Sequence, residues 1–178
     1  MCLQEVEAQF FFDELKPRFE AFGYSCVYKK RTGSKPDGCA ILVNLKKFNI
    51  IASREIEYYT PNVDLLDRDN VGLLALVEAK SPSGYNNASS GLDTPARLVI
   101  ANTHLLFNHR RGDIKLAQMQ ILLAEIDRLA LFGVDKNSPD KRMLVYYPVL
   151  LCGDLNLEPY SPLYNFITEG IFFECAIK

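Results

Sequence analysis

The segment 150–156 carries the residue types best suited to chemistry in this chain. Its apolar residues end at Gly153, and Asp154 and Asn156 follow two positions apart. Because residues i and i+2 of an extended backbone point to the same side, a carboxylate and an amide would lie together at the end of a strand. Such a pair could bind a hard cation or a phosphate. The same Gly-Asp-x-Asn pattern also forms a simple Asx turn, which needs no ligand.

Two other apolar segments end in groups that could work with this pair. Glu5 follows Leu3-Gln4, and His104 follows the run 99–103. If these strands share a rim, a metal-binding carboxylate, a second carboxylate and an imidazole meet there, which suits phosphoryl transfer. Alternatively, Glu5 is a surface charge at a strand end and His104 a half-buried structural histidine.

Basic residues gather in two places. Lys29, Lys30, Arg31 and Lys35 fall within seven residues that contain no acid, and Arg110, Arg111 and Lys115 follow His104 closely. Beside a phosphate site these charges could hold an RNA backbone, and otherwise they form a solvated surface. Phe107 could stack on a base or cap the core. The net charge of −2 gives no reason to expect non-specific nucleic-acid binding.

Apolar patterns predict a strand-rich fold with both faces of its sheets covered, which is an α+β class. The predicted strands are 3–6, 25–30, 38–44, 48–59 (mixed and extended), 71–78, 97–104 and 148–152, the last of them buried. The segment at about 81–96 contains Ser-Pro-Ser-Gly and Ser-Ser-Gly, which predicts a loop insertion, and 136–142 is a second polar loop.

Three segments have helical patterns. The first covers 8–22, with Pro17 as a point of kinking and Gly23 as its end. Its predicted apolar face contains Phe11, Leu15, Phe19 and Phe22. The second covers 113–132, and its predicted apolar face contains Ile114, Ala117, Ile121, Ala124 and Leu131. The third covers 162–168, with Ser161 as the N-cap and Pro162 in the first turn.

Length and composition favour one globular domain with a real core, since the 178 residues are 48% hydrophobic. No apolar run approaches the roughly 18 residues of a membrane span, and the first residues do not resemble a signal peptide. Five cysteines without a CxxC pattern, with Cys26, Cys39 and Cys152 in apolar strands, predict buried reduced thiols. These features predict a cytoplasmic protein, with the nucleus as a second location.

Several segments together resemble one protein family. They are Leu-Gln-Glu-Val-Glu at 3–7, Tyr-Lys-Lys-Arg-Thr-Gly-Ser-Lys-Pro-Asp-Gly-Cys-Ala at 28–40, Arg-Asp-Asn-Val-Gly at 68–72, Asn-Thr-His-Leu-Leu-Phe-Asn at 102–108, Arg-Arg-Gly-Asp-Ile-Lys-Leu at 110–116, Cys-Gly-Asp-Leu-Asn at 152–156 and Ser-Pro-Leu-Tyr-Asn-Phe at 161–166. The order and flanks resemble the endonuclease/exonuclease/phosphatase superfamily, which has the DNase I-like fold. The Lys-Pro-Asp-Gly-Cys-Ala and Arg-Arg-Gly-Asp-Ile-Lys stretches resemble the Angel family in its deadenylase-related branch.

This resemblance implies a four-layer α/β/β/α sandwich, with residues 1–178 as one partial domain. It implies that Glu5 and Asp154 bind Mg²⁺, or Mn²⁺ in its place, that His104 contacts the scissile phosphate, and that Asp154 also activates or positions the nucleophile near the metal. Asn156 would orient the phosphate, and Asn70 is a weaker phosphate-proximal candidate. The weaker substrate-binding candidates are Lys35, Phe107, Arg110 and Arg111. The carboxylate of Asp37 is expected to tie the turn before Gly38.

The implied function is a Mg²⁺-dependent phosphoesterase that acts on RNA 3′ ends, either as a poly(A) exonuclease or as a 2′,3′-cyclic phosphatase. The implied protein partners are mRNA-regulatory or translation proteins, and no membrane association is expected. The sequence departs from the family pattern: no Asn-bearing strand precedes Leu3, and no Ser-Asp-His motif follows Asn156. The chain is therefore expected to be a fragment with weak activity, since loss of an acid/base group costs about 10²–10⁴-fold in rate. The alternative is a non-catalytic RNA- or protein-binding module.

Overall fold

The computed structural model describes residues 1–80, 96–135 and 143–170. Its strands are β1 (Cys2–Glu7), β2 (Tyr24–Lys30), β3 (Asp37–Asn44), β4 (Phe48–Glu57), β5 (Val71–Ala79), β6 (Arg97–His104), β7 (Leu131–Asp135), β8 (Met143–Tyr146) and β9 (Val149–Asp154). Its helices are α1 (Ala8–Phe10), α2 (Lys16–Ala21), α3 (Gly112–Ala130) and α4 (Pro162–Glu169), with a π-helical turn at Phe11–Leu15 and a 3₁₀ turn at Asp64–Leu66.

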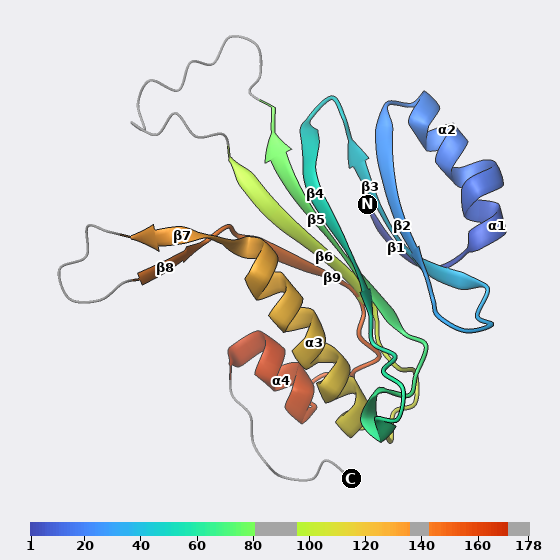
Figure 1. Cartoon of the computed structure of the whole chain (residues 1–178), viewed down its shortest axis with the longest axis vertical. Helices are drawn as coiled ribbons and strands as arrows, with labels where there is room; N and C mark the ends of the chain where they lie inside the picture. The colour runs from blue at the N-terminus through green and yellow to red at the C-terminus, as the bar shows by residue number, and fades with distance from the viewer. Residues whose placement is uncertain (81–95, 136–142, 171–178) are drawn as a thin grey trace.

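Two sheets pack face to face and helices cover their outer faces. One sheet has the strand order β1-β3-β2 and the other β4-β5-β6-β9, and within the second sheet β6 and β9 are parallel. Helices α1 and α2 lie outside the three-stranded sheet, and α3 and α4 lie outside the four-stranded sheet (Figure 1). The predicted α/β/β/α sandwich is therefore confirmed.

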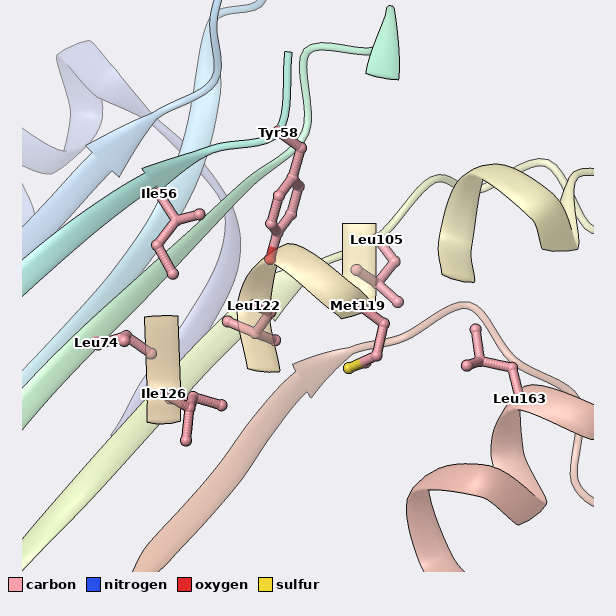
Figure 2. Packing of buried hydrophobic residues seen from close by; sticks show 9 residues of the cluster. Ile56, Tyr58, Leu74, Leu105, Met119, Leu122, Ile126 and Leu163 are labelled. Carbon is pink, nitrogen blue, oxygen red and sulfur yellow. The ribbon is translucent and has the colours of Figure 1, made fainter. Parts of the chain in front are cut away.

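The alternation of side chains along β5 explains why its residues 71–77 are all apolar. Successive strand residues point to opposite faces, and both faces of β5 are covered. Between the sheets the packed residues are Ile41, Val43, Leu73, Ala75 and Val77. On the other face, a cluster joins the four-stranded sheet to α3 and α4 (Figure 2). Its labelled members are Ile56, Tyr58, Leu74, Leu105, Met119, Leu122, Ile126 and Leu163.

The first predicted helix forms, but it is interrupted. The backbone N–H of Lys16 donates to Phe11 O, five residues back, just before Pro17, which has no N–H to donate. Phe11 is buried, as predicted, whereas Phe22 is 74% exposed at the C-terminus of α2, so its assignment to the buried face was wrong. The chain leaves the helix at Gly23, one residue after Phe22, where the backbone takes a positive φ of +81°.

The buried face of α3 also differs from the prediction. Ala124 and Leu131 are exposed, while two polar side chains, Lys115 and Gln118, are buried. The buried residues are Ile114, Lys115, Gln118, Met119, Leu122, Ile126 and Ala130. Their spacing follows the helical period well, but a hydrophobicity pattern assigns the two polar residues to solvent. The predicted cap of α4 is confirmed, because Ser161 Oγ accepts from Tyr164 N at 3.3 Å.

The last predicted strand was wrong in its burial. Among the described strands, β9 pairs with β6 alone, and Leu150 is 50% exposed. The hairpin of β7 and β8 was not predicted at all. The predicted insertion at about 81–96, apart from its last residue, and the loop at 136–142 lie outside the described residues. Among the helices that the structure describes, none has both the length and the apolar composition required to cross a bilayer.

The described cysteines are free thiols, but only Cys39 is fully buried, whereas Cys26 and Cys152 are half-buried. Burial raises the pKa of the Cys39 thiol to about 12. Because the thiolate is the reactive form, Cys39 should react with iodoacetamide at pH 8 at least about 100-fold more slowly in the folded protein than in the urea-unfolded chain. Mass spectrometry of timed samples measures this, and equal rates would contradict the burial described here.

Candidate functional site

The ends of β6 and β9 bring two predicted site residues together. In their parallel pairing His104 lies opposite Asp154, and Thr103 lies opposite Gly153. His104 Nε2 is 3.8 Å from Asp154 Oδ2. The imidazole is almost buried and the carboxylate is half exposed, so the pair lies at the rim of the four-stranded sheet with Asp154 toward solvent.

Gly153 permits this close approach. Its φ is +138°, and a Cβ at this position would lie 2.2 Å from Thr103 O. Beyond it, Asn156 N donates to Asp154 Oδ1 at 3.0 Å, and Asn156 Nδ2 donates to Leu105 O at 3.0 Å. The Asx turn offered as an alternative by the sequence is therefore present. It does not exclude a chemical role, because the other Asp154 oxygen faces His104.

Glu5 lies on a bulge of β1. The pairing of β1 with β3 shifts between Leu3 and Val6, and Glu5 has a φ of +55°. A bulge of this kind redirects a side chain, and a left-handed conformation in a residue other than glycine stores strain that is common at functional sites. The Glu5 carboxylate is exposed and lines a cleft that His104 also lines.

Asn102 joins the strand that carries Glu5 to the sheet that carries His104. Its Nδ2 donates to Leu3 O and to Ala40 O, both at 2.9 Å, and its Oδ1 accepts from Gln4 Nε2 at 2.6 Å. The side chain is completely buried between the two sheets. In the sequence, Asn102 belongs to the Asn-Thr-His motif of the family resemblance, but no role was assigned to it. Its position two residues before His104 was the available signal, since strand residues i and i+2 share a face.

The cleft has a volume of about 490 Å³. It is lined by Glu5, Arg31, Lys35, Asp67, Arg68, Asp69, Asn70, His104, Leu106 and Phe107. Five of these residues were candidates from the sequence: Glu5, Lys35, Asn70, His104 and Phe107. The cleft lies between residues of both sheets, and Asp67 and Asp69 are carboxylates that sequence reasoning did not assign to the site. The Arg68-Asp69-Asn70 motif was the signal that could have identified them.

The structure separates the members of the first basic cluster. Lys29 forms ion pairs with two glutamates of β4, Lys30 donates to backbone carbonyls, and Arg31 pairs with Asp37. The Asp37 carboxylate accepts from Arg31 Nε at 3.1 Å, and Arg31 N donates to Asp37 O at 2.9 Å, so the Asp37 carboxylate ties the turn before Gly38 as predicted. Lys35 lines the cleft, and no ion pair of Lys35 is found among the described residues. Of this cluster, Lys35 is therefore best placed to contact a ligand.

The second cluster lies beside the cleft, not in its lining. Both Arg111 Nη2 and Arg111 Nε bond to Asp113 in the first turn of α3, at 2.8 Å and 2.9 Å, and this pairing lowers the pKa of the Asp113 carboxyl. Arg110 is exposed. Phe107, in the loop that precedes both arginines, is 80% exposed and lines the cleft. An exposed ring at this position is available for stacking.

Buried hydrogen bonds fix the backbone around His104. Asn70 Nδ2 donates to His104 O at 3.0 Å, and Gln118 Nε2 donates to Asn70 Oδ1 at 3.2 Å. Gln118 Oε1 accepts from Leu106 N at 3.0 Å. Asn70 therefore supports His104 in addition to lining the cleft. His104 Nδ1 is buried and has no hydrogen-bond partner among the described residues, which is uncommon and typical of a functional group.

The donor set of the cleft is compatible with a divalent hard cation. Mg²⁺ usually takes one or two protein carboxylates and completes its shell with water and substrate phosphate. The exposed carboxylate of Glu5 meets this requirement, with Asp67 and Asp69 in the same lining. Among the described residues no three Asp, Glu, His or Cys side chains cluster closely enough to form a complete protein-only metal site.

Comparison with known proteins gives consistent relatives. No protein-family model matches the chain. It is 44% identical over 170 residues to protein angel homolog 1 of Homo sapiens and 46% identical over 170 residues to protein angel homolog 2 of Bos taurus. Both alignments cover 96% of this chain, but only 23% and 28% of the relatives, so the chain spans about a quarter of the curated relatives it matches.

Solved structures agree with the sequence relatives. The crystal structure of ANGEL2, a 2′,3′-cyclic phosphatase, in complex with adenosine-2′,3′-vanadate matches with a TM-score of 0.78 and 44% identity. That match covers 95% of this chain and 43% of the ANGEL2 chain. The human Nocturnin catalytic domain matches with a TM-score of 0.69 and 22% identity, over 94% of this chain and 55% of that domain, which shows the fold alone.

Proposed function

We propose that this chain, a homologue of the Angel proteins with part of the endonuclease/exonuclease/phosphatase fold, belongs to a metal-dependent phosphoesterase that acts on RNA 3′ ends. The observation that carries this proposal is the single cleft lined by Glu5, Asn70 and His104, with Asp154 beside His104. A metal-binding carboxylate and a phosphate-binding histidine within one nucleotide-sized cleft suit phosphoester hydrolysis.

Each residue has a proposed role. His104 would donate a hydrogen bond to an oxygen of the scissile phosphate, and Asp154 would hold and orient the attacking water. Asn156 Nδ2 already gives one hydrogen to Leu105 O, and its second hydrogen would serve a phosphate oxygen. Glu5 would hold Mg²⁺ or Mn²⁺, which when bound neutralises charge that develops on the phosphate. Asn70 would keep the His104 backbone in place.

The substrate proposal follows from ANGEL2, which is a 2′,3′-cyclic phosphatase. A terminal nucleotide with a cyclic phosphate fits a cleft of about 490 Å³, with its base on Phe107 and a neighbouring phosphate on Lys35. Arg110 and Arg111, beside the cleft, would contact the preceding RNA backbone. An RNA substrate would place the protein in the cytoplasm or nucleus. Since the chain covers 43% of the ANGEL2 chain, we expect the 178-residue piece alone to be weakly active.

The test measures phosphate release from an RNA oligonucleotide that ends in a 2′,3′-cyclic phosphate, and shortening of a poly(A) tail, with Mg²⁺ and with EDTA. We expect the full-length protein that contains this chain to release phosphate in Mg²⁺ and to release none in EDTA. Glu5→Gln should raise the Mg²⁺ concentration needed for half-maximal activity by at least about tenfold, because it removes the charge of the metal ligand. Glu7→Gln, two residues along β1, is the matched control.

Three outcomes would each overturn a different part of this proposal. Hydrolysis that persists in EDTA, or a Glu5→Gln variant with an unchanged Mg²⁺ requirement, would remove the metal role of Glu5. RNA binding without hydrolysis of either substrate would leave a non-catalytic RNA-binding module. Tail shortening without release of cyclic phosphate would keep the enzyme and replace the proposed substrate with poly(A).

A further inference from the structure

Lys115 is a charged residue in an unexpected position. It belongs to the second turn of α3, and its side chain is 2% exposed, although lysine is almost never buried without a partner. Its neighbours on the helix, Ile114 and Met119, are core residues. The sequence grouped Lys115 with the surface arginines of the second basic cluster, and the structure removes it from that surface.

The buried ammonium of Lys115 is directed at the turn that follows β9. Lys115 Nζ donates to Asn156 O at 2.5 Å. Asn156 has a φ of +50°, a left-handed conformation that costs free energy in any residue other than glycine. A charge-assisted hydrogen bond to its carbonyl offsets that cost, because such bonds are about twice as strong as neutral ones.

Two carboxylates act on the same ammonium through their charge. Burial lowers the pKa of Lys115, while the charges of Glu158 and Asp154 oppose this effect. Glu158 lies in the turn, and Asp154 is the last residue of β9, whose Oδ2 lies 3.8 Å from His104 Nε2. One cation on α3 therefore acts on the backbone of Asn156 and, through its field, on the carboxylate of Asp154.

Gln118, a second buried polar residue on α3, supports the end of β6 in a similar way. Gln118 lies one turn further along α3 and holds Leu106 N and the side chain of Asn70, which in turn holds His104 O. The two strand ends therefore share one support. The His104 loop is held through Gln118, and the Asn156 turn is held through Lys115.

We infer that Lys115 is a positioning residue for the phosphoesterase reaction. Its ammonium holds the Asn156 turn in its left-handed conformation, and this places Asp154 and Asn156 relative to His104. The expected effect on hydrolysis rests on the proposed function, whereas the support of the Asn156 turn by Lys115 does not. The comparison of Lys115→Met with Lys115→Arg tests it, because methionine keeps the apolar stem and removes the donor, whereas arginine keeps the charge and the donor. Arg128→Met, which removes an exposed cation of the same helix, is the control.

The first measurement is amide hydrogen exchange of the intact protein without substrate. Asn156 N donates to Asp154 Oδ1, so its exchange reports the state of the turn. In Lys115→Met we expect exchange at Asn156 to rise at least about tenfold, with unchanged exchange in β5 and β6, because one charge-assisted bond is lost. Arg128→Met should leave Asn156 unchanged, and Lys115→Arg should restore most of its protection.

The second measurement is steady-state hydrolysis of the cyclic-phosphate RNA. In Lys115→Met we expect kcat to fall about 10- to 100-fold with KM within about threefold of the original, as for other residues that hold catalytic groups. Unchanged exchange at Asn156, or an equal rise across α3, β5 and β6, would overturn the inference. If the unmodified protein hydrolyses nothing, the proposed function fails, and the exchange data still decide whether Lys115 holds the turn.

Discussion

Replacing His104 or Asp154 by alanine is expected to lower kcat on cyclic-phosphate RNA by about 10²–10⁴-fold in each case. His104 Nε2 and Asp154 Oδ2 are 3.8 Å apart at the ends of paired strands, so the two side chains are expected to act on the same phosphate as one unit. Residues that act as a unit have non-additive effects. The double variant should therefore remain within about tenfold of the slower single variant.

The comparison of single and double variants is the decisive part of this experiment. His109→Ala is the control for His104, because His109 is an exposed histidine of the same loop that does not line the cleft. Circular dichroism and urea unfolding of each variant establish that the fold persists. If the two single effects multiply in the double variant, His104 and Asp154 act independently, and the paired role assigned to them is wrong.

Asn102→Ala is expected to lower the free energy of unfolding by about 3 kcal/mol, because three buried hydrogen bonds are lost at about 1 kcal/mol each. The groups that lose their bond to Asn102 are Leu3 O, Ala40 O and Gln4 Nε2. Asn102→Asp should be worse than alanine, since a carboxylate cannot donate to the two carbonyls and would bury a charge. Urea unfolding followed by circular dichroism measures both changes.

A matched control for Asn102 is Asn44→Ala. Asn44 Oδ1 accepts only one exposed bond, from Lys46 N, and its loss should cost no more than about 1 kcal/mol. Phosphate release provides the second reading for Asn102, because β1 carries Glu5. At temperatures where Asn102→Ala is still folded, its Mg²⁺ requirement should rise. A variant as stable as the original chain would mean that Asn102 does not join the two sheets.

The sequence predicted most strands and the layer arrangement because the strand patterns are strong. β5 is apolar from residue 71 to residue 77 and was identified within one residue of its observed end. β9 looks the same in sequence, yet it is an edge strand with an exposed Leu150. An apolar run reports that a strand forms, but its burial depends on neighbours that come from other parts of the chain.

The sequence grouped Glu5 and His104 as candidates for one site, and the structure places both in one cleft. The buried polar residues around this cleft were not predicted. Asn102, Lys115 and Gln118 all have ordinary surface-type side chains in the sequence, and only the tertiary pairing shows that they are buried. Their partners are largely backbone groups, and residue types in a sequence carry no signal for such bonds.

One consequence follows from the placement of Glu5 and His104 on different sheets. The distance between their side chains is set by the thickness of the apolar layer that separates the sheets, in which Ala75 packs with Ile41 and Val43. Tightly packed interiors transmit small volume changes to their surroundings. An added methyl group at Ala75 would therefore increase the separation of the sheets and alter the fit of the substrate phosphate without touching it. Substitutions in this layer should be tolerated mainly when a gain of volume at one residue is matched by a loss at its neighbour.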